Sequence, residues 1–300
     1  MTGTGLILEG GGMRGAYTAG VLDFFQDKGI EFPFVSATSS SALIGSYYVA
    51  KQKGANIEIL QNILSNREAI SFKRLLRQKE LFEMDYIFHT IPTRLVPLNF
   101  ETFAQAQAKY VIGTTDIYTG EPVYFDHYPR KDDLLSLIRA SSSLPILASV
   151  VNYDGKQLMD GGIADPIPIR PSIACGNQKH VVILTRNRGY VKRKTRLNWL
   201  FKKVFREYPA FQKVLKQRHI LYNQTLSQIY ELEKRKQVFI LMPEAPIEST
   251  RTERNGKKLH ALYVQGYREA EKQEAALRRF LSHVHETRET VEPKPFIPVV

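Results

Sequence analysis

The chain lacks several features that mark whole classes of proteins. Its 300 residues include one cysteine, Cys175, so no disulfide can form within the chain, and we expect this side chain to be a small buried residue. No apolar run approaches the roughly 18–20 residues that a membrane-spanning helix needs. The N-terminus enters an apolar segment without the basic, apolar and cleavage regions of a secretory signal. With no metal-ligand cluster either, we expect a soluble, cytoplasmic protein without metal or cofactor.

Positive charge is concentrated in one stretch of the sequence. The net charge is +12, and residues 186–219 hold 12 Lys or Arg against one acid, Glu207. Apolar residues at 197, 200, 201, 204 and 205 follow helical spacing there, with Trp199 at the edge of the stripe. A basic amphipathic helix over about 190–220 is typical of proteins that bind the inner face of an anionic membrane. The candidate contacts are Lys192, Arg193, Lys194, Arg196, Lys202, Lys203 and Arg206.

Two other interpretations of this stretch stay open. The apolar stripe would also suit a helix that packs on the core, with its charges merely solvated. Basic residues also bind nucleic-acid phosphates, but no recognised binding module accompanies them, so we expect no nucleic-acid partner.

A glycine-rich loop follows the first apolar segment, residues 5–9. It reads Gly10-Gly11-Gly12-Met13-Arg14-Gly15 and precedes a helical pattern over 14–28. Strand, glycine loop and helix start together present several N–H donors to one anion. Gly10, Gly12 and Gly15 fit the dinucleotide pattern G-x-G-x-x-G, but the acidic residue expected at the end of the second strand is missing. The oxyanion of an acyl-transfer intermediate and a plain structural turn are the alternatives.

The second expected strand, residues 33–38, leads to Ser39. A serine on a sharp strand-to-helix turn projects its hydroxyl clear of the sheet, which is the geometry of a nucleophile elbow. The usual pattern is G-x-S-x-G, and here Ala37 and Ser41 replace the glycines with the next smallest residues. Taken alone, such a turn also fits a simple helix N-cap.

A nucleophilic serine needs a base, and an aspartate is the better candidate here. The histidines lie in charged helical stretches or near element ends, and only His127 is kept in reserve. Asp160 ends an expected strand, and Gly161 and Gly162 clear the space behind it. A structural Asp-Gly-Gly turn is the alternative interpretation. Burial would have to raise the pKa of an aspartate for it to accept a proton from serine.

Taken in order, these motifs resemble those of the patatin-like phospholipase family of bacterial type. The glycine loop, the serine elbow, the segment Arg139-Ala140-Ser141-Ser142-Ser143-Leu144-Pro145 and the Asp-Gly-Gly motif carry the resemblance. It implies a lipid acyl hydrolase with a Ser–Asp dyad, Ser39 as nucleophile and Asp160 as proton acceptor, and neither histidine nor metal. It also implies an oxyanion hole formed by Gly10, Gly11, Gly12, Met13, Arg14 and Gly15. For Arg14, a role at a lipid phosphate and a salt bridge to Glu9 or Asp160 both stay open.

The expected fold is α/β, a three-layer sandwich with a central, mostly parallel sheet. The resemblance places a catalytic core at residues 1–172 and a part that completes the fold at 173–300, with a disordered tail over 287–300. Expected helices span 14–28, 41–53, 56–65, 71–82, 132–140, 197–207, 210–235 and 257–284. Expected strands span 5–9, 33–38, 109–115, 121–126, 156–159, 180–185 and 237–242. The segment 65–100 is a candidate lid or channel wall.

The resulting expectation is a serine acyl hydrolase that cleaves ester bonds of phospholipids or other lipids. The departure from glycine at Ala37 and Ser41 leaves a catalytically impaired lipid-binding relative as one alternative. A nucleotide-binding enzyme of Rossmann type is the other.

Overall fold

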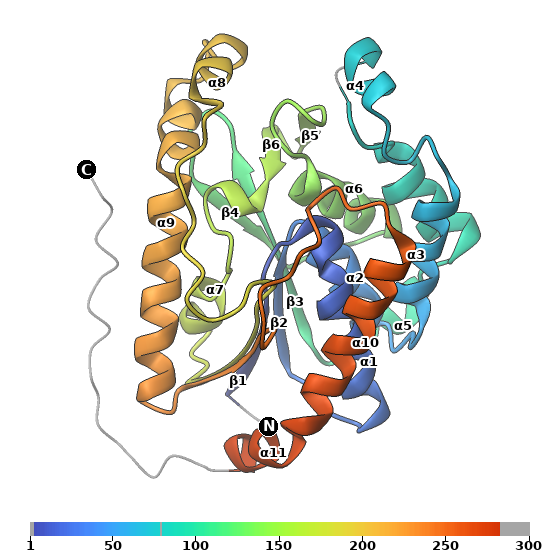
Figure 1. Cartoon of the computed structure of the whole chain (residues 1–300), viewed down its shortest axis with the longest axis vertical. Coiled ribbons are helices and arrows are strands. Elements are labelled where there is room, and N and C mark those ends of the chain that lie inside the picture. The colour runs from blue at the N-terminus through green and yellow to red at the C-terminus, as the bar shows by residue number, and fades with distance from the viewer. Residues whose placement is uncertain (1–2, 79, 283–300) are drawn as a thin grey trace.

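The computed structural model describes residues 3–78 and 80–282. A central sheet lies between two layers of helices (Figure 1). Its strands are β1 (Thr4–Leu8), β2 (Phe34–Thr38), β3 (Lys109–Asp116), β4 (Pro122–Phe125), β5 (Val151–Tyr153), β6 (Lys156–Asp160), β7 (Lys179–Ile183) and β8 (Val238–Leu241). The order is β5-β6-β3-β2-β1-β7-β8, with β4 also paired to β3. The expected α/β class with a mostly parallel sheet is therefore confirmed.

The sheet has a parallel half and an antiparallel half, which meet at β3. Strands β3, β2, β1, β7 and β8 run parallel to one another, whereas β4 and β6 pair antiparallel to β3 and β5 pairs antiparallel to β6. Parallel neighbours need crossover connections, and the helices α1 and α2 supply them for the first strands. A hairpin turn between Asp116 and Pro122 joins β3 to β4.

Helices cover both faces of the sheet. They are α1 (Gly15–Asp27), α2 (Ser40–Val49), α3 (Ala55–Ser65), α4 (Phe72–Gln78), α5 (Phe100–Ala104), α6 (Lys131–Ser142), α7 (Arg170–Ala174), α8 (Asn198–Val204), α9 (Pro209–Lys234), α10 (Gly256–Lys272) and α11 (Glu274–Ser282). Short 3₁₀ turns η1 (Gly12–Arg14) and η3 (Gly161–Ile163) and a wide π-type helix η2 (Tyr86–Leu95) complete the fold. Figure 1 shows α9 on one side of the sheet and α1, α2, α3 and α10 on the other.

The core follows the alternation of side chains along β1. Leu6 and Leu8 pack into the larger apolar cluster beneath α1, α2 and α10, while Ile7 packs into a second cluster with α9 and β8. Because successive side chains of a strand point to opposite faces, a strand buried on both faces has a continuous apolar sequence. The pattern in residues 5–9 is thus explained by helix layers on both sides.

Several expectations about single segments need correction. Residues 257–284 were expected to form one helix, but α10 ends at Lys272 and α11 begins at Glu274. Strand β5 was not expected, since three residues give too short a pattern. Cys175 is exposed rather than buried, because it lies just after α7 on the surface. The expected tail 287–300 lies outside the described residues.

Candidate active site

Ser39 occupies a strained turn between β2 and α2. Its backbone has φ 60° and ψ −141°, a conformation that costs a non-glycine residue on the order of 1–3 kcal/mol. Such strain persists where the surroundings fix it. The Ser39 N–H donates to Ser141 Oγ at 2.8 Å, and Ser141 Oγ in turn donates to the Gly113 carbonyl at 2.6 Å. The end of α6 and the middle of β3 therefore hold the turn in place.

The two small residues that replace glycine fit this turn. Ala37 is fully buried in β2 between β1 and β3. Ser41 is also fully buried, and its Oγ donates to the carbonyl of Glu9 at 2.6 Å. The hydroxyl that distinguishes Ser41 from glycine thus ties the first turn of α2 to the end of β1.

Asp160 lies directly against Ser39, although 121 positions separate them. Thr38 pairs with Gly113, and Asp160 pairs with the next residue of β3, Thr114. Consecutive residues of one strand thereby bring the end of β2 and the end of β6 together. Ser39 Oγ donates a hydrogen bond of 2.7 Å to Asp160 Oδ2.

The second carboxylate oxygen of Asp160 is held by the turn that follows it. The Gly162 N–H donates to Asp160 Oδ1 at 2.8 Å, and the Gly162 carbonyl accepts from Arg218 Nε at 2.6 Å. Only glycine fits at position 161, because a Cβ there would lie 2.1 Å from the Gly113 carbonyl oxygen. Burial raises the pKa of Asp160, while the Arg218 charge and the Ser39 hydrogen bond oppose that shift. A raised pKa makes the carboxylate a stronger base than an exposed aspartate.

The glycine loop approaches the same serine from the end of β1. In the part of the chain that the structure describes, the N–H groups of Gly11 and Gly12 donate no hydrogen bond. The Gly10 N–H, by contrast, donates to the Pro166 carbonyl at 3.3 Å, and the Met13 N–H to the Arg251 carbonyl at 3.1 Å. Gly12 has φ +59°, and a Cβ there would lie 2.7 Å from the same Arg251 oxygen. Two N–H donors of the loop therefore remain available to a ligand.

Arg14 forms neither of the ion pairs considered from the sequence. It is only 3% exposed, its Nε has no hydrogen-bond partner, and burial lowers the pKa of the guanidinium to about 10. Glu9 is instead bonded to the Thr185 N–H at 2.5 Å and to the Tyr222 hydroxyl at 2.9 Å. Gly15, the last residue of the motif, begins α1.

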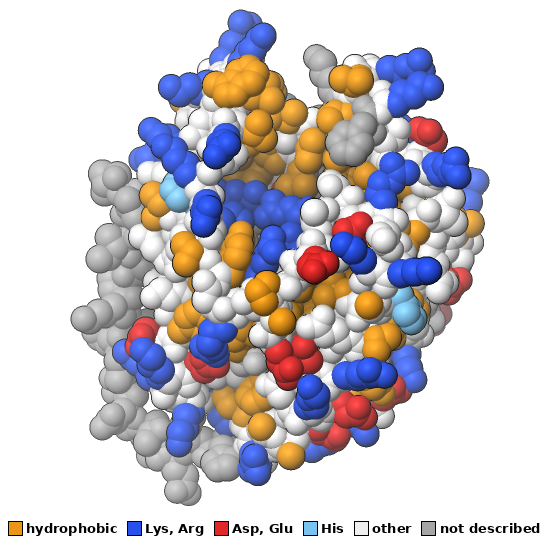
Figure 2. Space-filling view, in the orientation of Figure 1, with side chains coloured by type: hydrophobic (Ala, Val, Ile, Leu, Met, Phe, Trp, Pro, Cys, Tyr) orange, Lys and Arg blue, Asp and Glu red, His pale blue; other side chains and the backbone are white. Residues whose placement is uncertain are grey.

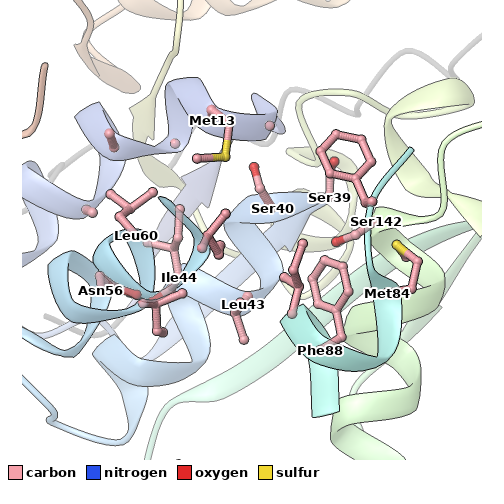
Figure 3. A pocket seen from close by; sticks show the side chains of 18 of the residues that line it. Met13, Ser39, Ser40, Leu43, Ile44, Asn56, Leu60, Met84, Phe88 and Ser142 are labelled. Carbon is pink, nitrogen blue, oxygen red and sulfur yellow. Dashed lines mark hydrogen bonds between the residues drawn. The ribbon is translucent and has the colours of Figure 1, made fainter. Parts of the chain in front are cut away.

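An apolar cavity of about 80 Å³ opens on one side of Ser39 (Figure 3). Its walls come from α1, α2, α3 and the segment 82–88, whose Phe82, Met84, Ile87 and Phe88 line it. Segment 65–100 therefore supplies a wall of the cavity, one of the two roles expected for it. Ser40 and Ser142 add hydroxyl groups to the lining (Figure 3).

Basic side chains gather on the other side of Ser39. Figure 2 shows Lys and Arg side chains at the bottom of a hollow below α8 and α4, with apolar side chains on its walls. Lys192, Arg218 and Arg251 line a small pocket together with Ser39, Asp160 and the glycine loop. Sequence patterns do not indicate that these three cations converge on Ser39. They predict Lys192 as a membrane contact and no role for Arg218 or Arg251.

Other expected candidates lie away from this place. His127 is exposed in the loop after β4 and has no hydrogen bond to Ser39 or Asp160. Within the described residues, no group of three or more His, Cys, Asp or Glu side chains could hold a metal ion. None of the described helices is long and apolar enough to cross a membrane.

Comparison with known families decides the identity of the fold. The model of the patatin-like phospholipase family matches residues 6–173, which include the glycine loop, Ser39 and Asp160. The chain belongs to the patatin-like phospholipase family. A second match, to a domain of unknown function (DUF6363), covers residues 208–282. The patatin-like part therefore contains β1 to β6, while α9, β8 and α10 belong to the second match.

The chain has relatives in bacteria and fungi. It is 33% identical to YjjU of Escherichia coli over 187 residues, 60% of this chain and 51% of that protein. It is 25% identical to the NTE family protein Rv1063c of Mycobacterium tuberculosis over 173 residues, 55% and 44% of the two chains. It is 26% identical to the lysophospholipase nte1 of Aspergillus fumigatus over 174 residues, 55% and 11% of the two chains. The chain thus spans about half the length of the first two relatives.

A search of solved structures finds VipD of Legionella pneumophila, with a TM-score of 0.45 and 13% sequence identity. The alignment covers 92% of this chain and 67% of VipD.

Proposed function

We propose that the protein is a serine acyl hydrolase that cleaves carboxylic ester bonds of phospholipids or other lipids. Ser39 is the nucleophile, and Asp160 is the proton acceptor. The observation that carries the proposal is the 2.7 Å hydrogen bond from Ser39 Oγ to a buried Asp160, at the mouth of an apolar cavity. Membership of the patatin-like phospholipase family and the relationship to a lysophospholipase support it.

In the first half-reaction, Ser39 Oγ attacks the ester carbonyl carbon and its proton passes to Asp160 Oδ2. The carbonyl oxygen becomes an oxyanion, which accepts hydrogen bonds from the N–H groups of Gly11 and Gly12. A single donor of this kind contributes about 2.7–4 kcal/mol to transition-state stabilisation in other acyl-transfer enzymes. The bond to the alcohol then breaks, and the alcohol takes the proton back from Asp160. An acyl group remains on Ser39.

In the second half-reaction, a water molecule takes the place of the alcohol. It attacks the acyl carbonyl carbon while Asp160 accepts its proton, and the oxyanion binds to the same two N–H groups. The bond to Ser39 Oγ breaks, the proton returns from Asp160 to Ser39, and a free fatty acid leaves. Gly162 and Arg218 act as positioning groups, since they fix the orientation of the Asp160 carboxylate.

Two alternatives are less well supported. A catalytically impaired relative would require an elbow that no longer aligns Ser39, yet Ala37 and Ser41 are accommodated and the Ser39–Asp160 bond is present. A Rossmann-type nucleotide site would need an acidic group after β2, where Ser39 stands instead.

The first test compares wild type with Ser39→Ala and Asp160→Asn. Hydrolysis of a short p-nitrophenyl ester and of mixed phospholipid vesicles should fall by roughly three or more orders of magnitude in both variants, because the dyad acts as a unit. A fluorophosphonate probe should label wild type stoichiometrically and leave Ser39→Ala unlabelled. Ser65→Ala, an exposed serine on α3, is the matched control. Unchanged hydrolysis by folded Ser39→Ala would refute the assignment.

We also propose that the enzyme docks peripherally on an anionic membrane through α8 and the residues around it. Leu197, Trp199 and Val204 are 48%, 67% and 50% exposed, whereas Phe205 of the same stripe is buried against α9. The stripe is thus divided between the two uses considered from the sequence. Arg193, Lys194, Arg196, Lys202, Lys203 and Arg206 are exposed around it, but Lys192 belongs to the hollow beside Ser39.

A further inference from the structure

The space around Ser39 has two chemically different sides. The apolar cavity and the small polar pocket share Gly12, Ser39 and Leu144, so the serine lies at their boundary. The polar pocket continues into a larger cavity of about 250 Å³, with which it shares Leu144, Lys192, Arg218 and Arg251. A ligand bound at Ser39 can therefore extend one end among apolar side chains and the other among cations.

In the described part of the chain, none of the three cations of the second side forms an ion pair. Lys192, Arg218 and Arg251 take part in none of the ion pairs within the described ranges 3–78 and 80–282. The larger cavity has no Asp or Glu in its lining. The smaller pocket contains two acids, Glu9 and Asp160, and both already accept other hydrogen bonds.

Contacts hold the side chains of two of these cations in place. Lys192 Nζ lies 4.7 Å from the centre of the Tyr222 ring, and Arg218 donates its Nε proton to the Gly162 carbonyl. Arg251 is fixed at its backbone, where its carbonyl accepts from the Met13 N–H. Lys192 and Arg218 are thus fixed and partly desolvated, and they form the preorganised part of an anion site, because their side chains have little conformational entropy left to lose on binding.

Burial and mutual repulsion lower the pKa values of two of these cations, and Asp160 and Glu9 offset that effect only in part. Burial and the charge of Arg251 lower the pKa of Arg218 to about 10, and burial and the charge of Arg218 lower the pKa of Lys192. Arg14, almost fully buried next to the loop, adds a further cation whose Nε has no partner. A bound anion would offset this mutual repulsion.

We propose that Lys192, Arg218 and Arg251 form a binding site for the phosphate of a phospholipid head group, next to the ester that Ser39 attacks. The proposal rests on the proposed hydrolase function and specifies its substrate. In a glycerophospholipid, a few covalent bonds separate the ester carbonyl from the phosphate, and the acyl chain extends the opposite way. Phosphate is an anion that Arg and Lys bind well through charge-assisted hydrogen bonds.

The test compares phospholipid with the corresponding uncharged lipid, both as monomers so that membrane docking does not contribute. Dihexanoyl phosphatidic acid and dihexanoylglycerol present the same ester with and without the phosphate. In Lys192→Gln and Arg251→Gln, the ratio of kcat/KM for the first over the second should fall on the order of 10- to 100-fold, mainly through KM. Lys216→Gln, an exposed lysine on α9, removes the same charge and should leave the ratio unchanged.

A binding measurement separates the head group from free phosphate and from catalysis. Glycerol 3-phosphate should raise the melting temperature of the Ser39→Ala protein, and Lys192→Gln in that background should remove the shift. If inorganic phosphate gives the same shift while the kcat/KM ratio is unchanged in the variants, the site binds free phosphate and the proposal fails. The proposal also fails if the variants leave the kcat/KM ratio unchanged and neither anion raises the melting temperature. If wild type hydrolyses neither lipid, the hydrolase function fails, and the melting shifts alone decide the anion site.

Discussion

At the scale of residues, the candidate site depends on where single backbone groups lie. Gly113 and Thr114 are neighbours in β3, and the pairing of Thr38 and Asp160 with them brings Ser39 and Asp160 within hydrogen-bond distance. Two local features of the site lower the stability of the folded protein: the strained backbone of Ser39 and the buried carboxylate of Asp160. Strain and buried charge are common where function competes with stability.

A second buried acid, Asp165, allows the effect of carboxylate burial on stability to be tested away from Ser39 and Asp160. It is 1% exposed, Tyr124 donates to its Oδ2, and burial raises its pKa to about 6. Because the folded state binds this proton more tightly than the unfolded state, stability falls as pH rises from about 4 to about 6. We expect Asp165→Asn to unfold at a higher temperature than wild type above pH 7, by up to about 3 kcal/mol in unfolding free energy, and to lose the advantage near pH 4.

The measurement is thermal unfolding by circular dichroism over this pH range. Asp132→Asn, an exposed residue at the start of α6, controls for the loss of one negative charge. A stability difference between Asp165→Asn and wild type that does not change with pH would contradict the prediction.

At the scale of elements, α8 is the part of the described chain that best suits contact with a membrane surface. It has no buried residue, and Figure 1 shows it beyond the end of α9, away from the sheet. Figure 2 shows basic side chains around the apolar tip. Basic residues near an anionic surface contribute about 1 kcal/mol each.

We therefore expect the double variant Lys202→Gln, Lys203→Gln to bind phosphatidylglycerol vesicles on the order of 30-fold more weakly than wild type. Trp199→Ala should weaken it further by removing an interfacial aromatic side chain. Vesicle sedimentation measures both effects, and high salt should reduce wild-type binding to the level of the lysine variant. Ile220→Ala, an exposed apolar residue on α9, is the control. Equal binding of wild type to neutral and anionic vesicles would exclude the docking role.

At the scale of the whole molecule, the C-terminal part is built into the same fold as Ser39 and Asp160. Strand β8 extends the sheet beyond β7, and α10 crosses α1. The crossing is close because Gly20 and Gly266 face it. A Cβ at Gly20 would lie 2.0 Å from the Tyr263 carbonyl oxygen, and one at Gly266 would lie 2.1 Å from the Tyr17 carbonyl oxygen.

Gly266→Ala should accordingly destabilise the entire protein. Overpacking of this kind costs about 1–3 kcal/mol, and we expect one cooperative transition at lower temperature rather than a separate melting of residues 208–282. Differential scanning calorimetry checks both points. Gly256→Ala on the same helix, whose Cβ would meet only Leu64 at 3.4 Å, should be neutral or slightly stabilising. Two resolved transitions would mean that the C-terminal part folds as an independent unit.

The sequence predicts this molecule unevenly, and the reason is physical. Strands, glycine loop, elbow and Asp160 are local patterns whose order resembles that of one family, so Ser39 and Asp160 could be paired in advance. The sequence did not predict that β6 runs antiparallel to β3, which brings Asp160 beside the end of β2. The meeting of the cations could not be predicted. Lys192 and Arg251 lie in two different loops and Arg218 in a long helix, and helical periodicity does not indicate where such segments converge. Ser141 could be singled out only as part of a resembling segment. Its hydrogen bonds to Ser39 and Gly113 depend on tertiary packing.

The pairing of β3 has a further consequence for how correct assembly can be recognised. In a strand, a shift of one residue turns every side chain to the opposite face. If β6 paired one position away from Thr114, Asp160 would point away from Ser39, and the hydrogen bond between the two side chains would be lost. A folding population with the sheet misaligned would still be compact and would have the same content of helix and strand. The fraction of chains that a fluorophosphonate titrates would therefore count the molecules whose strands are in register, which circular dichroism does not resolve.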